Sequence, residues 1–422
     1  MRRIGFHWLP LILAGHAACT CAAVITVTSS SGGSNDGSGC TLRDAITAAN
    51  TDAPAGTCSP GNGADVVVLP ANVTITLTGA DNAISSGNGL PVVHSDITVQ
   101  GNGATIQRDP ALSCNLNGVN EPGEFRLLRI ESGTVALQHL TLAGGCADDN
   151  YATGGGLQNY GTLVISSSVI RGNASHDFGG GILNFGGLVL IDSLLQDNVG
   201  GSSGGALYNY DGAHAGISRS AFVHNIASST GNGSNPSGGA IANNVGSVLD
   251  VSNASFNGNQ AYLGAALSNE QGTVTLSSAS FAGDVVGGNG AGGVLRSYNP
   301  PANGSFGIKN CLMGASTAGA NCYVQSGGFT MVGANLSSDA SCAGFSISQT
   351  DPKLAPLGYN GGPTPTFALL AGSPAIDAAS DCKDIAGNTL ATDQRGRVRP
   401  YGPACDLGAY ERDDLIFADG FE

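Results

Sequence analysis

Charged side chains are scarce in this chain of 422 residues. Asp, Glu, Lys and Arg together make up only 11% of it, lysine occurs three times, and the formal net charge is −15. A surface so poor in cations is badly suited to phosphate backbones, so the composition argues against a nucleic-acid partner. After the first 18 residues there is also no run approaching the roughly 18 apolar residues that a membrane helix needs, so we expect no transmembrane segment.

The first residues predict export from the cell. Residues 1–3 include two arginines, residues 8–18 are mostly apolar, and residues 21–23 are small. These are the three parts of a secretory signal peptide, so we expect residues 1–23 to be removed and the protein to be secreted or to lie on the cell surface. Lipid attachment at Cys19 is disfavoured because His16 stands where an aliphatic residue is expected. At the other end we expect residues 413–422 to form a flexible acidic tail.

The cysteines lack any Cys-x-x-Cys spacing, which gives zinc and redox sites little support. Eleven cysteines minus Cys19 and Cys21 leave nine in the mature chain. In an exported protein nine cysteines predict disulfides plus one unpaired thiol. Spacing alone leaves the connectivity open. Pairing neighbours gives Cys40–Cys58, Cys114–Cys146, Cys322–Cys342 and Cys382–Cys405, with Cys311 left free.

Glycine, by contrast, is abundant, at 66 residues, and much of it belongs to a repeat. Blocks of the form Gly-Gly-small-aliphatic-x-Asn, the last two degraded, begin at Gly154, Gly179, Gly204, Gly238, Gly264 and Gly292. Successive starts lie 25, 25, 34, 26 and 28 residues apart. Repetition at this period indicates a solenoid, in which each unit buries its apolar face only against its neighbours.

Aligned on this repeat, three columns of like residues run through the chain. One asparagine column comprises Asn159, Asn184, Asn209, Asn243 and Asn269. A second comprises Asn173, Asn198, Asn225 and Asn259 and ends at Asp284. A large apolar column comprises Ile170, Leu195, Phe222, Phe256 and Phe281. Equivalent positions on stacked strands lie about 4.8 Å apart, so we expect ladders of amides and a stack of apolar side chains, all structural.

These columns predict an all-β fold, a right-handed parallel β-helix. Leucine-rich repeats and calcium-binding nonapeptide repeats are not supported, because the chain lacks leucine at fixed spacings and lacks tandem Gly-Gly-x-Gly-x-Asp. An ordinary antiparallel sandwich would not keep the same Gly-Gly and Asn positions through successive turns. We expect an N-terminal capping module at 24–71 with a short helix that begins at Thr41, the β-helix at 72–345, and an irregular C-terminal cap at 346–412. Disulfide Cys382–Cys405 would staple that cap.

Three segments resemble known families. Residues 36–46 (DGSGCTLRDAI) look like the CSLREA-type N-terminal module, with Thr41 and Asp44 in place of its Ser and Glu. Residues 335–411 resemble the choice-of-anchor Q module through NGG at 360–362, SPAID at 373–377, DQRG at 393–396 and GAYE at 408–411. The repeats, such as GGAI at 238–241 with FNGN at 256–259, are similar to those of polymorphic outer-membrane proteins. The resemblance implies a bacterial exported or surface β-helix protein and no defined catalytic residues.

A few residues are candidates for chemistry. Asp197 and His224 fall on adjacent coils, with Arg171 nearby, so a carboxylate and an imidazole would be available for acid–base catalysis. A solvated contact at a coil corner explains the same pattern. Asp148 and Asp149 are calcium candidates, although an acidic turn beside a disulfide explains them equally well. No other cofactor is indicated.

Two functions follow from the sequence. The first is non-enzymatic binding or adhesion to a glycan, a surface or a protein partner. The alternative is a carbohydrate-active enzyme, a polysaccharide lyase or glycoside hydrolase of the pectate-lyase-like fold. A lyase needs a basic side chain beside bound calcium, and cations are few and scattered here. A hydrolase needs two carboxyl groups across a groove.

Overall fold

The protein is built from short parallel strands wound into a β-helix. The computed structural model describes residues 22–231, 235–287, 292–300 and 304–413. Within these ranges the strands form three parallel sheets of nineteen, eight and six strands, and there is one helix. No helix in these ranges is long and apolar enough to cross a membrane. The expected signal peptide, apart from its last two residues, and the expected tail after residue 413 lie outside the described residues.

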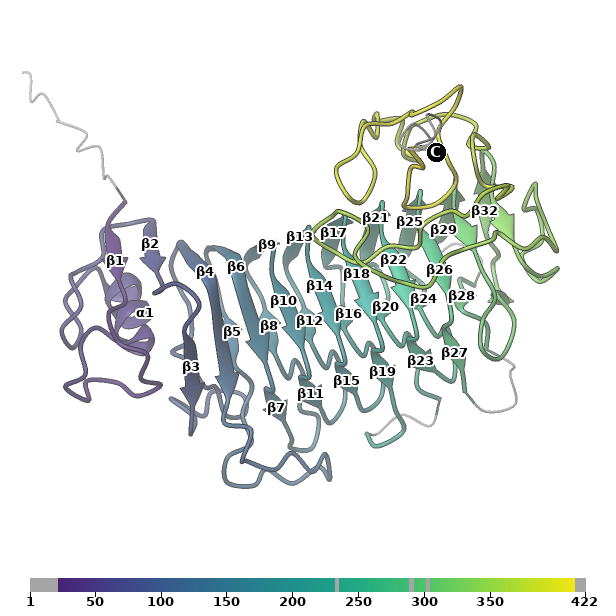
Figure 1. Cartoon of the computed structure of the whole chain (residues 1–422). Helices are drawn as coiled ribbons and strands as arrows, with labels where there is room; N and C mark the ends of the chain where they lie inside the picture. Colours follow the sequence, from purple (N-terminus) through teal and green to yellow (C-terminus); the bar gives the residue numbers. More distant parts are fainter. Residues whose placement is uncertain (1–21, 232–234, 288–291, 301–303, 414–422) are drawn as a thin grey trace, which may run out of the picture.

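The nineteen-stranded sheet has two columns of strands, joined by the long strands β4 and β6 (Figure 1). The first column comprises β1 (Val24–Thr26), β2 (Asp65–Val68), β4 (Ile97–Arg108), β6 (Thr134–Ala143), β9 (Thr162–Ser166), β13 (Gly187–Ile191), β17 (His214–Ser218), β21 (Val248–Ser252), β25 (Thr273–Ser277), β29 (Ser305–Lys309) and β32 (Thr330–Val332). The second comprises β3 (Thr74–Leu77), β10 (Val169–Arg171), β14 (Leu194–Gln196), β18 (Ala221–Val223), β22 (Ser255–Asn257), β26 (Ser280–Ala282), β30 (Leu312–Met313) and β33 (Leu336–Ser337).

The two smaller sheets complete each coil. The six-stranded sheet comprises β7 (Cys146–Ala147), β11 (Ala174–Ser175), β15 (Val199–Gly200), β19 (Ile226–Ala227), β23 (Gln260–Ala261) and β27 (Val285–Val286). The eight-stranded sheet comprises β5 (Leu128–Ile130), β8 (Leu157–Asn159), β12 (Ile182–Asn184), β16 (Leu207–Asn209), β20 (Ile241–Asn243), β24 (Leu267–Glu270), β28 (Leu295–Tyr298) and β31 (Cys322–Ser326). The prediction of a parallel β-helix is confirmed.

The apolar column forms a continuous stack in the core. Ile170 is in register with Leu195, and Leu195 with Phe222. The ring centroids of Phe222 and Phe256 lie 4.9 Å apart, and those of Phe256 and Phe281 lie 4.7 Å apart, with all three rings buried. Such near-parallel stacking follows from identical residues at identical positions of successive coils.

Both asparagine columns form hydrogen-bonded ladders. In the first, each Nδ2 from Asn159 to Asn243 donates to Oδ1 of the next member, at 2.7 to 2.9 Å. This ladder continues from Asn269 to Asn299 at 3.2 Å. In the second, Asn173 donates to Asn198 at 3.0 Å, and the series ends where Asn259 donates to Asp284 at 2.9 Å. Because each amide is paired, burial at the coil corners leaves no asparagine donor unsatisfied.

At the N-terminal end, helix α1 (Leu42–Thr51) packs against β1 and β2 (Figure 1). Thr41 is its N-cap, and Thr41 Oγ1 accepts a hydrogen bond from the backbone nitrogen of Asp44. The Asp44 carboxylate in turn accepts from the Asn35 backbone nitrogen, at 3.0 Å, and so anchors the preceding loop. The side chains of Leu42 and Ile46 are buried, so the apolar face of the helix packs on the first coils.

The C-terminal segment is irregular, as expected, and is stapled by the disulfide Cys382–Cys405. Residues after about 350 fold back along the side of the coils (Figure 1, yellow). Ser255 Oγ donates to Gln394 Oε1 at 2.7 Å, and the Ala409 backbone nitrogen donates to Ser280 Oγ at 2.9 Å. Leu194 and Val223 point outward from the coils, and removing their apolar surface from water is favourable. Leu357 of the returning segment packs against them. Phe345, just before this segment, is a member of the buried core.

The four expected disulfides, Cys40–Cys58, Cys114–Cys146, Cys322–Cys342 and Cys382–Cys405, are all present. Cys311 has a free, buried thiol. Such cross-links fit a protein that works in an oxidising, extracellular compartment.

Candidate functional site

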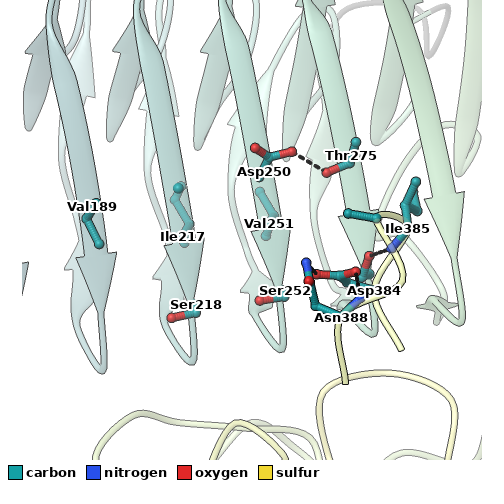
Figure 2. A pocket seen from close by; sticks show the side chains of 13 residues that line it. Val189, Ile217, Ser218, Asp250, Val251, Ser252, Thr275, Asp384, Ile385 and Asn388 are labelled. Carbon is teal, nitrogen blue, oxygen red and sulfur yellow. Dashed lines mark hydrogen bonds between the residues drawn. The ribbon is translucent and has the colours of Figure 1, made fainter. Parts of the chain in front are cut away.

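A groove lies between the outer face of the nineteen-stranded sheet and the returning C-terminal segment (Figure 2). Its volume is about 440 Å³. The lining residues are Val189, Gly216, Ile217, Ser218, Asp250, Val251, Ser252, Thr275, Ser277, Asp384, Ile385, Ala386 and Asn388. Four successive strands, β13, β17, β21 and β25, therefore form one wall, and the loop at 384–388 forms the other.

The strand register produces the polar floor of the groove. Gly216, Asp250 and Thr275 are register partners on β17, β21 and β25, at a position that points away from the core. Because Gly216 has no side chain, the space beside Asp250 stays open, and a Cβ added to Gly216 would meet nothing within 4 Å. The Asp250 carboxylate therefore faces an accessible hollow.

Asp250 is held by two neighbours. Thr275 Oγ1 donates to Asp250 Oδ1 at 2.5 Å, and His214 Nε2 lies 3.1 Å from Asp250 Oδ2. The side chains of His214 and Asp250 are 62% and 50% exposed, so both reach solvent. A carboxylate beside an imidazole can accept hydrogen bonds from a ligand or exchange a proton with it.

The opposite wall is a tight loop that the sheet fixes in place. Asp384 accepts hydrogen bonds from Asn388, at 2.8 Å from the backbone nitrogen and 2.9 Å from Nδ2. The Ile385 backbone nitrogen donates to Ser277 Oγ at 3.1 Å. Lys309 Nζ, on the adjacent strand β29, lies 2.9 Å from the Asp381 carboxylate just before the loop. The loop thus presents its carboxylate and amide on a rigid support.

The sequence-based catalytic candidates lie elsewhere. Asp197 and His224 are close, with Oδ1 and Nδ1 3.8 Å apart, but their side chains are 53% and 59% exposed and line no part of this groove. Gln196 Nε2 also donates to Asp197 Oδ2 at 2.8 Å. Arg171 lines a separate cavity of about 270 Å³ beside Asp109.

Backbone geometry accounts for the Asp197 and His224 column. In successive coils this position is held by Gly172, Asp197, His224, Gly258 and Gly283, with φ of 61°, 56°, 54°, 65° and 73°. It is a turn position in the left-handed region, where glycine is favoured and Asp and His are among the tolerated substitutes. The His224 ring lies over Gly258, where a Cβ would meet its Cδ2 at 2.2 Å. The geometry favours a solvated corner contact.

Two other aspartates are held by neighbouring coils. The backbone nitrogen of Asp192 donates to the Ser218 carbonyl oxygen at 3.3 Å, and its carboxylate pairs with Arg219, with both oxygens 2.8 Å from guanidinium nitrogens. These hydrogen bonds raise the pKa of Arg219. Asp177 is buried and accepts from Ser202 Oγ at 3.1 Å.

The calcium candidates already have hydrogen-bond partners. The Asp148 carboxylate accepts from the backbone nitrogens of Asn117 and Gly118, at 2.8 and 2.9 Å. Asp149 accepts from Ser86 Oγ. Across the described ranges, no three His, Cys, Asp or Glu side chains come together in a group able to hold a metal ion. Calcium at Asp148 and Asp149 stays a prediction.

Sequence reasoning missed the groove residues Asp250 and Asp384, and His214, which pairs with Asp250. A signal was available for Asp250, because the strand Val248–Ser252 carries a carboxylate at an outward position that is Val189 or Gly216 in the preceding coils. No comparable signal marks Asp384, whose position depends on the return of the C-terminal segment.

Comparison with known proteins supports the fold. No protein-family model matches the chain, and no curated protein matches it in sequence. Among solved structures it is similar to pectate lyase Pel9A, with 14% sequence identity and a TM-score of 0.52. The match covers 92% of this chain and 96% of that one. At this identity the likeness establishes a pectate-lyase-like β-helix and no activity.

Proposed function

We propose that the protein binds a neutral polysaccharide in the groove between β17, β21, β25 and the loop at 384–388. The observation that carries this proposal is the open row of Gly216, Asp250 and Thr275, faced by Asp384 and Asn388. The similarity of the whole solenoid to pectate lyase Pel9A supports a carbohydrate ligand.

The chemistry of the groove suits sugar hydroxyls. Carboxylates accept hydrogen bonds, the hydroxyls of serine and threonine both donate and accept, and an asparagine amide does both. Val189, 40% exposed, offers an apolar surface for the C–H face of a sugar ring. Ser218, Ser252 and Ser277 are register partners on successive coils about 4.8 Å apart, so an extended chain lying along the axis meets a hydroxyl on each of them.

The charge of the groove favours a neutral ligand over an acidic one. Its lining residues include two aspartates and no lysine or arginine. Bringing a polyuronate or a phosphate polymer beside Asp250 and Asp384 would place like charges together at an energetic cost. The proposed ligand therefore differs in charge from pectate, the polymer named in the structural neighbour.

A binding panel with matched variants tests the proposal. The purified protein is applied to neutral and acidic polysaccharides, and affinities are measured by calorimetry. We expect binding to a neutral glycan, weakened about tenfold or more in Asp250→Ala and His214→Ala. Asp197→Ala and His224→Ala remove the same residue types from an exposed pair outside the groove and should leave affinity unchanged. An equal loss of affinity in the groove variants and in the control variants, or binding only to acidic polymers, would show that the proposed groove is not the binding site for a neutral glycan.

Hydrolysis is the second candidate function, because two carboxylates, Asp250 and Asp384, line one groove. Glycosidases use such a pair as acid and base or nucleophile. The test is release of new reducing ends from a glycan that binds. Release that is abolished in Asp250→Asn and in Asp384→Asn, but retained in Asp197→Asn, would establish it. Binding without release would leave the protein a lectin-like β-helix.

A further inference from the structure

A buried carboxylate at the start of the solenoid is only half satisfied. Asp65, the first residue of β2, is 1% exposed. Its Oδ1 accepts hydrogen bonds from the backbone nitrogens of Asn62, at 2.8 Å, and Ala23, at 3.2 Å. Its Oδ2 is buried and has no hydrogen-bond partner. A buried acceptor left without a donor costs about 1–3 kcal/mol, and more when it is charged.

The surroundings of Oδ2 supply no missing protein donor. A Cβ added to Gly61 would lie 2.4 Å from Asp65 Oδ2 and 2.8 Å from the Ala48 backbone carbonyl oxygen. Backbone therefore occupies the Gly61 side of Oδ2, and the polar atom found there is an acceptor. The Ala23 nitrogen already donates to Oδ1 of the same carboxylate, so it is the described group from which a second donor hydrogen can be sought.

Ala23 is already part of the first coil. Its carbonyl oxygen accepts a hydrogen bond from the Val66 backbone nitrogen at 2.9 Å, and Val24 is in register with Val66. As an ordinary amide, Ala23 nitrogen donates one hydrogen to Asp65 and carries no charge. As an α-ammonium group it would carry three hydrogens and a positive charge, enough to serve both oxygens of the carboxylate.

We propose that the chain is cut between Ala22 and Ala23 during export, and that the new α-ammonium group of Ala23 binds the Asp65 carboxylate. A peptidase of the export machinery would hydrolyse this bond with one water molecule. The carboxylate forms on Ala22 and the ammonium group on Ala23. Thr20 and Ala22 provide the small residues that such peptidases require.

The alternative cut, after Ala23, fits the structure less well. It corresponds to the boundary of 1–23 expected from the sequence. It would remove the carbonyl that Val66 uses and the nitrogen that Asp65 uses, and the ammonium group of Val24 would lie one residue, about 3.3 Å, farther along the strand. A cut one residue earlier keeps both contacts and adds a charge opposite Asp65.

The first test is the mature N-terminus. The full chain of 422 residues is produced in a bacterium with a general secretion pathway, and the exported protein is examined by intact mass and N-terminal sequencing. A protein that begins at Ala23 supports the proposal. A protein that begins at Val24 or upstream of Ala23, or one that stays uncut, overturns it.

The second test asks whether the ammonium group pairs with Asp65. Proteins made to begin at Ala23 or at Ala22 are compared by thermal unfolding. We expect the additional residue to lower Tm by about 1–3 °C in the native sequence. In Asp65→Asn it should have no effect, whereas in Asp96→Asn, an exposed control, the difference should persist. No shift in the native sequence, or an equal shift in Asp65→Asn, overturns the pairing. If Asp65→Asn does not fold, the comparison between the native-sequence proteins that begin at Ala23 and at Ala22 decides alone.

Discussion

Asp284 Oδ1 accepts two hydrogen bonds from Asn259, at 2.8 Å from its backbone nitrogen and 2.9 Å from its Nδ2. In the asparagine units before it, Nδ2 also donates to a backbone carbonyl of the previous coil, as Asn259 does to Phe222 at 3.0 Å. Asp284 has an oxygen in place of that amide, and Oδ2 is buried without a hydrogen-bond partner. Burial raises the pKa of Asp284 to about 7.

Asp284→Asn should therefore stabilise the protein at neutral and alkaline pH. Between about pH 4 and pH 7 folded Asp284 holds a proton that the unfolded chain has released, so the stability of the native protein falls as pH rises through this window. Asparagine does not titrate. We expect the variant to be more stable at pH 8 by up to about 4 kcal/mol, since one pKa unit corresponds to about 1.4 kcal/mol, and the gain should shrink towards pH 4.

Urea unfolding between pH 4 and pH 8 measures this difference. Asn259→Asp is the matched control, because it adds a second carboxyl to the same ladder and should destabilise most at high pH. A gain for Asp284→Asn that does not vary with pH would contradict the proposed protonation.

Cys311 should be unreactive in the folded protein. Its thiol is fully buried, and burial raises its pKa to about 12. The thiolate is the reactive form, so alkylation at pH 8 should be negligible until the chain unfolds. Mass spectrometry after iodoacetamide treatment, with and without denaturant, checks this. Labelling of the native protein at the rate of a free peptide thiol would show that the site opens readily.

Phe256→Ala should destabilise the solenoid strongly. Phe256 lies between Phe222 and Phe281 in the ring stack and is wholly buried. Removing it leaves a cavity bordered by two rings, and such changes cost about 3–5 kcal/mol. Phe256→Leu keeps most of the volume and should cost much less. Equal losses for the two variants in urea unfolding would contradict this, because ring stacking and not apolar volume would then account for the stabilisation.

Gly216→Val should block the groove without harming the fold. Position 216 lies on a strand, and a side chain there would point outward into open space. Valine therefore fits, and its strand propensity is higher than that of glycine. The new side chain would occupy the hollow beside Asp250. Glycan affinity should fall while Tm holds or rises. Gly187→Val, an outward position on β13 outside the groove lining, is the control and should leave affinity unchanged.

The coil register was predictable from the sequence because side chains at equivalent positions touch one another. Asn198 needs an amide above and below it, and Phe256 needs an apolar neighbour, so both columns repeat visibly along the chain. The disulfides were expected on a weaker basis, the pairing of cysteines that are neighbours in the sequence, because spacing alone left the connectivity open.

The groove was harder to foresee because its second wall comes from elsewhere in the chain. The place of Asp384 depends on where residues after 350 return, and this is set by outward apolar side chains such as Leu194 that break the solvent-facing pattern only locally. The alignment of the repeats also singled out Asp197 and His224 as catalytic candidates. These two residues occupy a turn position that requires a positive φ in every coil, and they share that backbone conformation and no chemical role.

In most solenoids a repeat communicates only with the repeats beside it, so the ends fray independently. Here Asn253 and Ser255 are hydrogen-bonded to Thr392 and Gln394, 139 positions further along the chain. That long-range tie makes the later coils and the returning segment a single cooperative block. A ligand seated between them would therefore resist forced extension of the protein, because pulling the C-terminus must first peel away the wall that encloses it.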